Sequence, residues 1–284
     1  MTDAASDSAP ALVWTRTRPT PRRQAPSVDR IVERAVAIAD AEGLDALSMR
    51  RVAADLGSGT ASLYRYVASR DELLDLMTDA VQGEVGPPRP SGDWRGDLAA
   101  VASGLRALML RHPWLSSELV GRSNLGPMSL RRADAALGAA AELTDDITLA
   151  ADIVDTVMAY VLGVVAAELA EIQASRRTGL TDEQWQSSVG PYMREIVDGG
   201  QYPWFARRVM EAEDSDPEQR FDFGLACVLD GVAARAGARA ARSPGRRSGA
   251  GGTGRRSPGR APGRASLEGL STAAAETPGG NSEA

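Results

Sequence analysis

Lysine is absent from this 284-residue sequence, and cysteine and histidine occur only once each. The single cysteine, Cys227, excludes an internal disulfide, and its apolar neighbours indicate a small buried side chain rather than a reactive thiol. The one histidine, His112, is not accompanied by a cluster of cysteines or carboxylates, which argues against a metal site held by the protein alone. We therefore expect neither a bound metal ion nor a structural disulfide.

Long apolar runs and a secretion signal are also missing. No uninterrupted apolar stretch approaches the roughly 20 residues that a membrane-spanning helix requires. The first residues, MTDAASDSAP, carry acids and hydroxyls where a signal peptide has basic and apolar segments. The sequence shows no phosphate-binding glycine loop, nucleophile elbow or dinucleotide fingerprint. These absences predict a cytoplasmic protein that has no membrane span, needs no cofactor and is not an enzyme.

Charge is distributed unevenly along the chain, although the net charge is only −6. Residues 1–70 hold 10 arginines and 8 acids, residues 71–234 hold 13 and 27, and residues 235–284 hold 9 and 3. Nucleic acid repels an acidic surface, so contacts with phosphates must come from the two ends of the chain, chiefly from the segment between Arg16 and Arg70.

Helical periodicity divides the chain into four segments. Residues 1–26 mix Pro, Thr and Arg without periodicity and are predicted to be a flexible basic leader, which either trails onto DNA or is simply disordered. Residues 27–85 and 93–236 are two helical domains, separated by the Gly/Pro run of residues 86–92. Residues 237–284, rich in Gly, Pro, Ser and Arg, are predicted to be a disordered tail that either attracts phosphates or is an incidental extension.

The expected fold class is all-α, with a small amino-terminal three-helix unit and a larger helical domain. Apolar residues three and four apart predict the first helices between Ser27 and Gly43, between Ser48 and Gly57, from Thr60 to Val67, and from Ser69 to Gly83. The larger domain has predicted helices near 93–111, 127–142, 146–175, 181–198 and 216–236, with less regular structure at 112–126 and 199–215.

The second and third helices, joined by a turn at Gly57, have the arrangement of a helix-turn-helix unit that reads DNA. Residues 47–74 read LSMRRVAADLGSGTASLYRYVASRDELL. A hydroxyl residue caps helix two, Leu-Gly precedes the turn, and a Leu-Tyr-x-x-Val block lies on the third helix. This segment closely resembles the DNA-binding signature of the tetracycline-repressor family, which implies that the third helix lies in the major groove of double-stranded DNA.

The resemblance implies roles for ten residues in DNA binding. The guanidinium of Arg50 matches the two acceptors on the guanine edge. Other base contacts are expected from Thr60, Ala61, Ser62 and Arg65. Phosphate contacts are expected from Ser48, Tyr64, Tyr66 and Arg70, and Arg51 could serve either purpose. The alternative is that the tyrosines pad a small core and the arginines face solvent. Because Ser58 and Tyr66 depart from the tetracycline repressor's pattern, the operator sequence is not transferred.

The resemblance extends more weakly to about residue 235, through Arg111–Leu115 and Leu130–Leu137. It implies a regulatory domain that forms a homodimer through a four-helix bundle and encloses a small-molecule effector. Two apolar stripes suit either this bundle or an intramolecular core: Ile153, Val154, Val157, Val161, Leu162 and Val165, and Phe221, Leu225, Val228, Leu229 and Val232. Pocket candidates, each of which could equally be core, are Met109, His112, Trp114, Met128, Met158 and Tyr160.

The sequence thus predicts a homodimeric transcription repressor that leaves a palindromic operator when an effector binds. A ligand-independent DNA-binding protein or an activator is the alternative within the same class. A helical enzyme with an appended DNA-binding module is the alternative from another class, and the sequence shows no catalytic constellation to support it.

Overall fold

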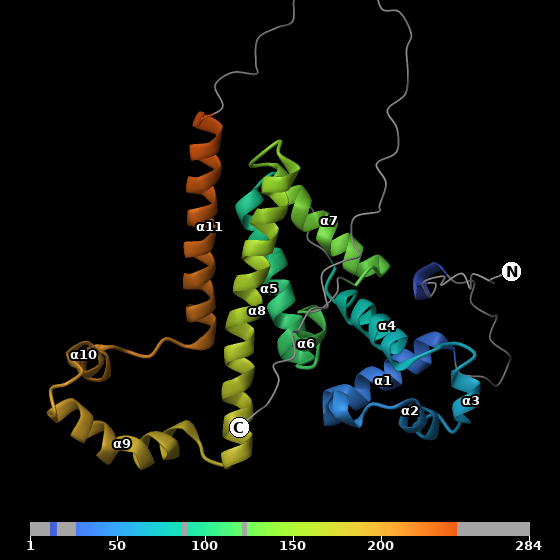
Figure 1. The fold of residues 1–284 in the computed structure, drawn as a ribbon, viewed down its shortest axis with the longest axis horizontal. Helices are drawn as coiled ribbons and strands as arrows, with labels where there is room; N and C mark the ends of the chain where they lie inside the picture. Colours follow the sequence, from blue (N-terminus) through green and yellow to red (C-terminus); the bar gives the residue numbers. More distant parts are fainter. Residues whose placement is uncertain (1–11, 16–26, 87–89, 121–123, 243–284) are drawn as a thin grey trace, which may run out of the picture. The chain divides into compact units, whose positions relative to one another are not determined.

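The computed structural model describes residues 12–15, 27–86, 90–120 and 124–242 (Figure 1). Over this part of the chain the regular elements are helices and no strand is present, which confirms the all-α fold class. Most of the leader and everything from residue 243 onward, including most of the arginine-rich tail, lie outside the described residues.

The amino-terminal region contains α1 (Val28–Glu42), α2 (Met49–Asp55), α3 (Thr60–Leu63) and α4 (Arg70–Gln82). Serine side chains begin three of these helices: Ser27, Ser48 and Ser69 each accept a hydrogen bond from a backbone N–H of the first turn. Between α2 and α3 the chain turns at Gly57, whose φ of 62° suits glycine. Helix α3 is shorter than the predicted 60–67, and Tyr64 to Tyr66 follow it as a turn.

Part of the leader is ordered, contrary to the prediction of a flexible segment. Val13–Thr15 form a single 3-10 turn, and the side chain of Val13 is buried against the core. The turn contacts α4. Burial of this isolated apolar pair, Val13 and Trp14, explains the order, since a leader of Pro, Thr and Arg offers nothing else to bury.

The larger region consists of α5 (Trp94–Arg111), α6 (Leu115–Leu119), α7 (Pro127–Ala141), α8 (Ile147–Thr178), α9 (Asp182–Asp198), α10 (Pro203–Glu211) and α11 (Pro217–Arg242). Helices α6 and α10 occupy stretches that were predicted to be less regular. The prediction that the disordered tail begins at residue 237 is also wrong, because α11 continues to Arg242. Alanine and arginine favour helix strongly enough to offset one glycine, Gly237, whose cost is about 1 kcal/mol.

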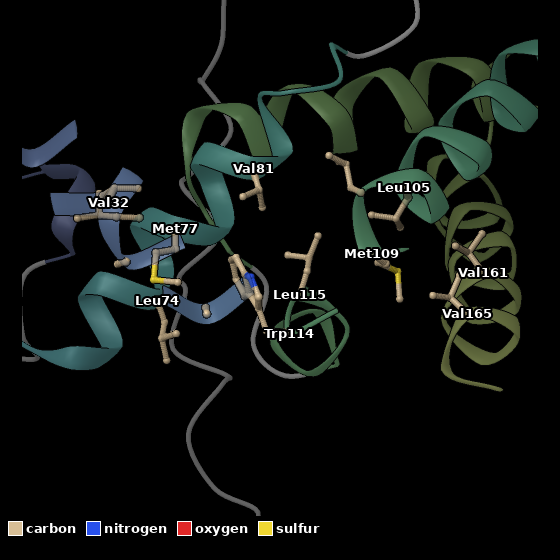
Figure 2. Close-up of a cluster of buried hydrophobic side chains, with 14 of the residues drawn as sticks. Val32, Leu74, Met77, Val81, Leu105, Met109, Trp114, Leu115, Val161 and Val165 are labelled. Atoms are coloured by element: carbon tan, nitrogen blue, oxygen red, sulfur yellow. The ribbon is translucent and has the colours of Figure 1, made fainter. Parts of the chain in front are cut away.

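One continuous apolar core joins the two regions (Figure 2). It runs from Val32 on α1, through Met77 and Val81 on α4, to Leu105 on α5 and Val161 on α8. The sequence predicted a separate core for each domain, with a boundary at residues 86–92. Instead, α4 belongs to both regions, because its buried residues face α1 on one side and α7 and α5 on the other.

The two apolar stripes of the larger region are largely buried within a single chain. Ile153, Val157, Val161 and Val165 on α8, and Phe221, Leu225, Leu229 and Val232 on α11, are all buried, whereas Val154, Leu162 and Val228 are half-buried. Helix α8 packs against α5, α7 and α11. The stripes therefore form an intramolecular core, and a dimer interface must use other faces of these helices.

Helix α8 and the cysteine of α11 differ from what the sequence indicated. Helix α8 is long and apolar enough to cross a membrane by length and composition, although it contains no uninterrupted apolar run of that length. One such helix is weak evidence for a membrane span, because the core helix of a soluble protein meets the same criteria. Cys227 on α11 is exposed rather than buried.

Candidate nucleic-acid interface

The segment from α2 through α3 and the turn that follows it (Figure 1) carries most of the side chains that are predicted to bind DNA. Leu63 and Val67 are fully buried, as their spacing predicted, which directs the residues between them outward. The exposed members of the predicted set are Ser48, Arg50, Ala61, Tyr64, Arg65 and Arg70, whereas Arg51, Thr60, Ser62 and Tyr66 are half-buried. Tyr64 is 50 % exposed, which is inconsistent with a role as core padding.

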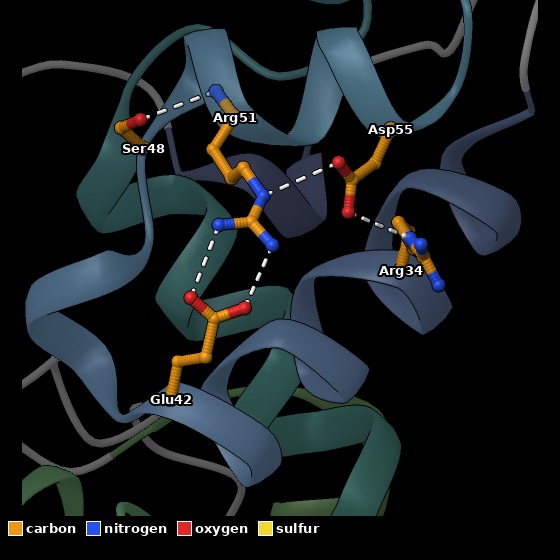
Figure 3. Close-up of polar contacts among 5 residues, drawn as sticks. All are labelled: Arg34, Glu42, Ser48, Arg51 and Asp55. Carbon is orange, nitrogen blue, oxygen red and sulfur yellow. Dashed lines mark hydrogen bonds and ion pairs between the residues drawn. The ribbon is translucent and has the colours of Figure 1, made fainter.

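Arg51 is committed to contacts within the protein (Figure 3). Its Nη1 and Nη2 donate to the two carboxylate oxygens of Glu42 at 3.1 and 2.7 Å, and its Nε donates to Asp55 at 3.2 Å. Asp55 also accepts from Arg34 at 3.1 Å. Hydrogen bonds and attraction from Glu42, followed by Asp55, raise the pKa of Arg51. All three of its guanidinium nitrogens therefore fasten α2 to the end of α1, which favours a structural role over either predicted DNA contact.

Ser48 and Arg70 also have structural partners. The hydroxyl of Ser48 accepts from the backbone N–H of Arg51 at 3.2 Å and caps α2. Arg70 donates to the backbone carbonyls of Leu44 and Leu47 at 2.9 and 3.3 Å, which fixes the turn that leads into α2. These contacts hold the start of α2 in place, and the phosphate contacts expected of the two residues stay predictions.

Arg50 differs from its neighbour. It is exposed, and no described residue pairs with it through a hydrogen bond or an ion pair. Arg65 has one partner, Ser62, whose hydroxyl accepts from Nη2 at 2.9 Å. An unpaired guanidinium can donate to base edges or phosphates without first breaking a contact of its own.

A polar cluster that was not predicted from the sequence connects this region to the larger one. The ring of His112, whose side chain is 4 % exposed, lies between Asp40 on α1 and Glu84 just beyond α4. Nδ1 is 2.8 Å from Asp40 and Nε2 is 3.1 Å from Glu84. Trp114 Nε1 also donates to Asp40, at 2.7 Å, and Arg111 donates to Glu84, at 2.8 Å. We call these five residues the hinge cluster.

Charge defines the chemistry of the hinge cluster. Carboxylates only accept hydrogen bonds, and each ring nitrogen of His112 lies within hydrogen-bond distance of one of them. Burial would raise the pKa of Glu84, but hydrogen bonds and positive charge from His112 and Arg111 outweigh it and lower this pKa. The cluster joins α1, α4 and the α5–α6 junction through charge-assisted bonds.

A second joint connects α4 with α7. Oδ1 of Asp79 accepts from the backbone N–H groups of Met128 and Ser129 at 2.8 and 2.9 Å, and so caps the start of α7. Arg132 is buried and donates to the carbonyls of Gln82 and Val85, at 3.1 and 2.6 Å, at the end of α4. Burial lowers the pKa of Arg132. Both ends of this joint would transmit a movement of α7 to α4.

The six pocket candidates are not gathered around one cavity. Met109 and Trp114 are buried in the core, His112 belongs to the hinge cluster, and the Tyr160 hydroxyl donates to the carbonyl of Phe221 at 2.7 Å. Met158 is half-buried against the core. Met128 is the one that lines a cavity of about 560 Å³, which lies among Trp14, α1 and α4. Trp14 also lines this cavity and was not among the predicted pocket residues, although it belongs to the one apolar stretch of the leader.

No metal centre is indicated. Among the described residues, no group of three or more His, Cys, Asp or Glu is placed to hold a metal ion. The hinge cluster holds only one histidine with two carboxylates, and its ring nitrogens are engaged.

Comparison with known proteins identifies relatives of both regions. The family described as bacterial regulatory proteins, tetR family, matches residues 31–77, and the family described as tetracyclin repressor-like, C-terminal domain, matches residues 86–236. The chain is 43 % identical over 228 residues to the HTH-type transcriptional repressor DrrR1 of Streptomyces coeruleorubidus, covering 78 % of this chain and 83 % of that protein. It is 25 % identical over 209 residues to the class A tetracycline repressor protein of Escherichia coli, covering 72 % of this chain and 89 % of that one.

A solved structure shares the fold. The crystal structure of the Streptomyces coelicolor TetR family protein ActR in complex with actinorhodin aligns with a TM-score of 0.63 and 33 % sequence identity. The alignment covers 75 % of this chain and 97 % of that one.

Proposed function

Because this chain belongs to the tetR family of bacterial regulatory proteins, we propose that it is a homodimeric repressor that leaves a palindromic operator when a small-molecule effector binds. The observation that carries the proposal is the outward polar face of α2 and α3. Arg50 and Tyr64 are exposed on it, while Leu63 and Val67 anchor it in the core. A regulator of this class acts in the cytoplasm, and we place the protein there.

The DNA contacts divide into two groups. Arg50 and Arg65, with Thr60, Ala61 and Ser62, read base edges in the major groove. Tyr64 and Tyr66 fix the register on phosphates, assisted by Ser48 and Arg70. Arg51 contributes indirectly, since its bonds to Glu42 and Asp55 hold the helix on which Arg50 lies.

A second copy of the chain would cover apolar surface that one copy leaves open. Helices α9 and α10 pack against each other, yet their large side chains are exposed: Trp185, Tyr192, Tyr202, Trp204, Phe205, Val209 and Met210. On α11, Phe223 is 75 % exposed and lies one turn before the exposed Cys227. A large exposed apolar patch on a soluble protein marks an interaction site, and a second copy of the chain would cover these side chains. An operator with two-fold symmetry has two half-sites about 34 Å apart, so it requires two DNA-binding regions, one from each copy of a homodimer. We call the DNA-binding region of one copy, α1 to α4, its reading head.

The effector acts on the larger region. Met158 on α8 is the candidate that stays with this proposal, because it is half-buried and methionine adapts to a ligand's shape. The related ActR has been solved with actinorhodin bound. A movement of α7 or α6 would reach the reading heads through the Asp79 joint and the hinge cluster. A coupling of about 1 to 3 kcal/mol would weaken DNA binding roughly 5- to 150-fold.

The test is a titration of the full-length protein with DNA from around its own gene. Arg50→Ala and Tyr64→Ala are compared with Arg131→Ala, a charge-matched control on the exposed face of α7. Loss of a bidentate base contact should weaken specific binding by about 10-fold or more in Arg50→Ala, while the control binds like wild type. Equal binding by all four proteins would show that this face does not read DNA.

Effector response is tested separately, because a ligand-independent regulator would bind DNA in the same way. A compound that binds only the folded protein raises its melting temperature, and the stabilisation grows with the logarithm of the ligand concentration once this exceeds Kd. A compound that both raises the melting temperature and releases the operator identifies the effector. If compounds that shift the melting temperature leave DNA binding unchanged, the repressor is not relieved by a ligand.

A further inference from the structure

We propose that the cavity among the leader turn, α1, α4 and the start of α7 is a second ligand site, which binds a molecule with a flat apolar body and a protonated amine. Its volume of about 560 Å³ lies within the range of small-molecule sites. The site belongs mainly to helices of the DNA-binding region and is therefore distinct from an effector site at Met158 on α8. Its existence does not depend on the proposed repressor function.

The floor of the cavity is apolar. Val32, Leu76 and Val81 line it and are buried, and Val36 lines it and is half-buried. Trp14 and Met128 add an aromatic ring and a polarisable thioether to the lining, and both are half-buried. Such walls favour a planar ring system, which can pack against the indole and the thioether at once.

The rim of the cavity is acidic. Asp29, Glu33, Asp79 and Glu84 contribute four carboxylates, and no lining residue carries a positive charge. Asp79 is occupied at the start of α7, and Glu84 bonds to Arg111 and His112. Asp29 and Glu33 are the other two carboxylates of the lining.

Asp29 and Glu33 provide the charge that selects the ligand. They are exposed, lie four residues apart on α1 and thus share one face of the helix, and no described residue forms an ion pair with either. Two like charges at this spacing repel each other. A cation placed between them is attracted by both carboxylates and also reduces their mutual repulsion. An ammonium group on a ligand that fills the apolar floor would occupy this position, whereas a carboxylate would be repelled.

The position of the site makes it a point of control. A bound molecule would touch α1 and α4 of the reading head and Met128 on α7 together. Gly83, at the end of α4, already lies close to Met128, since a Cβ there would be 3.1 Å from its Cγ. A ligand in the cavity would therefore fix the reading head relative to α7 without entering the larger region.

Three matched naphthalene probes test the proposal by calorimetry on the full-length protein: 1-naphthaleneethylamine, the neutral 1-naphthaleneethanol, and 1-naphthaleneacetate. The amine should bind about tenfold more tightly than the acetate, because exposed carboxylates attract one and repel the other. Asp29→Asn with Glu33→Gln should remove this preference but keep binding of the neutral alcohol. Trp14→Ala should weaken all three probes.

Three results would overturn the proposal. The first is an amine affinity equal to that for the acetate, and the second is a preference that survives in the Asp29→Asn, Glu33→Gln protein. The third is that the amine binds only after the leader arginines Arg16, Arg18, Arg22 and Arg23 are replaced by glutamine, which would mean that the leader itself fills the cavity. Both carboxamide substitutions are at exposed positions, so the fold is expected to tolerate them. DNA binding is measured in parallel with Arg50→Ala, which separates failure of this site from failure of the repressor function.

Discussion

Replacing His112 by phenylalanine should destabilise the protein, because it removes the central group of the hinge cluster while keeping a ring of similar size. The side chain of His112 is 4 % exposed, and it bonds to two carboxylates at 2.8 and 3.1 Å. A hydrogen bond to a charged group contributes about 1.5 to 3 kcal/mol. The carboxylates of Asp40 and Glu84 are 31 % and 36 % exposed, so water partly replaces the lost partner. We therefore expect the free energy of unfolding to fall by about 2 to 4 kcal/mol in total.

Urea denaturation at neutral pH measures this change as a lower midpoint with an unaltered m-value. The matched control is Trp114→Phe, which removes one hydrogen bond to Asp40 and keeps an aromatic side chain, and it should cost about 1.5 kcal/mol, the lower end of the range for a bond to a charged group, because Asp40 is partly exposed. A double-mutant cycle of His112→Phe with Asp40→Asn should show a coupling energy, since the two residues are in contact. A loss below about 0.5 kcal/mol in His112→Phe, or no coupling with Asp40, would refute the assignment of the cluster as a stabilising joint.

The pH dependence of the same variant has a defined sign. The pKa of Glu84 is lowered in the folded protein from an ordinary value of 4.5, so its ion pairs add stability above pH 4.5 and lose it as the pH falls through the lower folded-state pKa. Without His112, Glu84 keeps only Arg111 as a charged partner, so its pKa is lowered less than in the wild type. The difference in stability between wild type and His112→Phe should therefore shrink on acidification, and a difference that grew below pH 4.5 would contradict this reasoning.

Two further predictions concern the reading head and the homodimer. Arg51→Ala should lower the melting temperature, because three hydrogen bonds to Glu42 and Asp55 are lost. Arg50→Ala should leave the melting temperature unchanged. Scanning fluorimetry measures both variants, and equal melting temperatures would contradict the structural role of Arg51. Cys227 should react quickly with iodoacetamide in dilute protein and more slowly as the concentration rises and a partner covers α11. A labelling rate that is the same in monomer and dimer fractions separated by gel filtration would place the interface elsewhere.

Local signals in the sequence were sufficient for the reading head. Ser27 and Ser48 cap their helices, Gly57 makes the turn, and the spacing of Leu63 and Val67 identifies the buried side of the third helix. Each of these features depends on residues within about one helical turn of each other. For this reason they could be predicted without knowing the rest of the fold.

Features that join distant segments were not predicted. His112 meets Asp40 across 72 positions of sequence and Glu84 across 28, and no local pattern encodes such pairs. The bonds of Arg51 to Glu42, nine residues away, could not be separated from a DNA contact for the same reason. The pocket candidates were chosen by residue type alone, which does not distinguish a core methionine such as Met109 from one beside a cavity such as Met128.

The exposure of Cys227 follows from the helical periodicity of α11, although its apolar neighbours in sequence suggested burial. Its neighbours are apolar, yet it lies two positions after the buried Leu225 and two before the buried Leu229. A displacement of two residues turns a side chain by about 200°, to the opposite face of a helix. Helical periodicity along α11, rather than local composition, would have placed this thiol on the surface.

The shared core from α1 to α8 limits how this protein can exchange parts with its relatives. Met77 and Val81 on α4 serve the reading head and the regulatory region together, so no cut between the regions leaves both hydrophobic interiors closed. A chimera that joins this DNA-binding region to the regulatory domain of a relative would inherit mismatched side chains at α4, and overpacking or cavities there typically cost several kcal/mol. Specificity for DNA and specificity for effector are thus expected to change by substitutions within each region rather than by recombination between them.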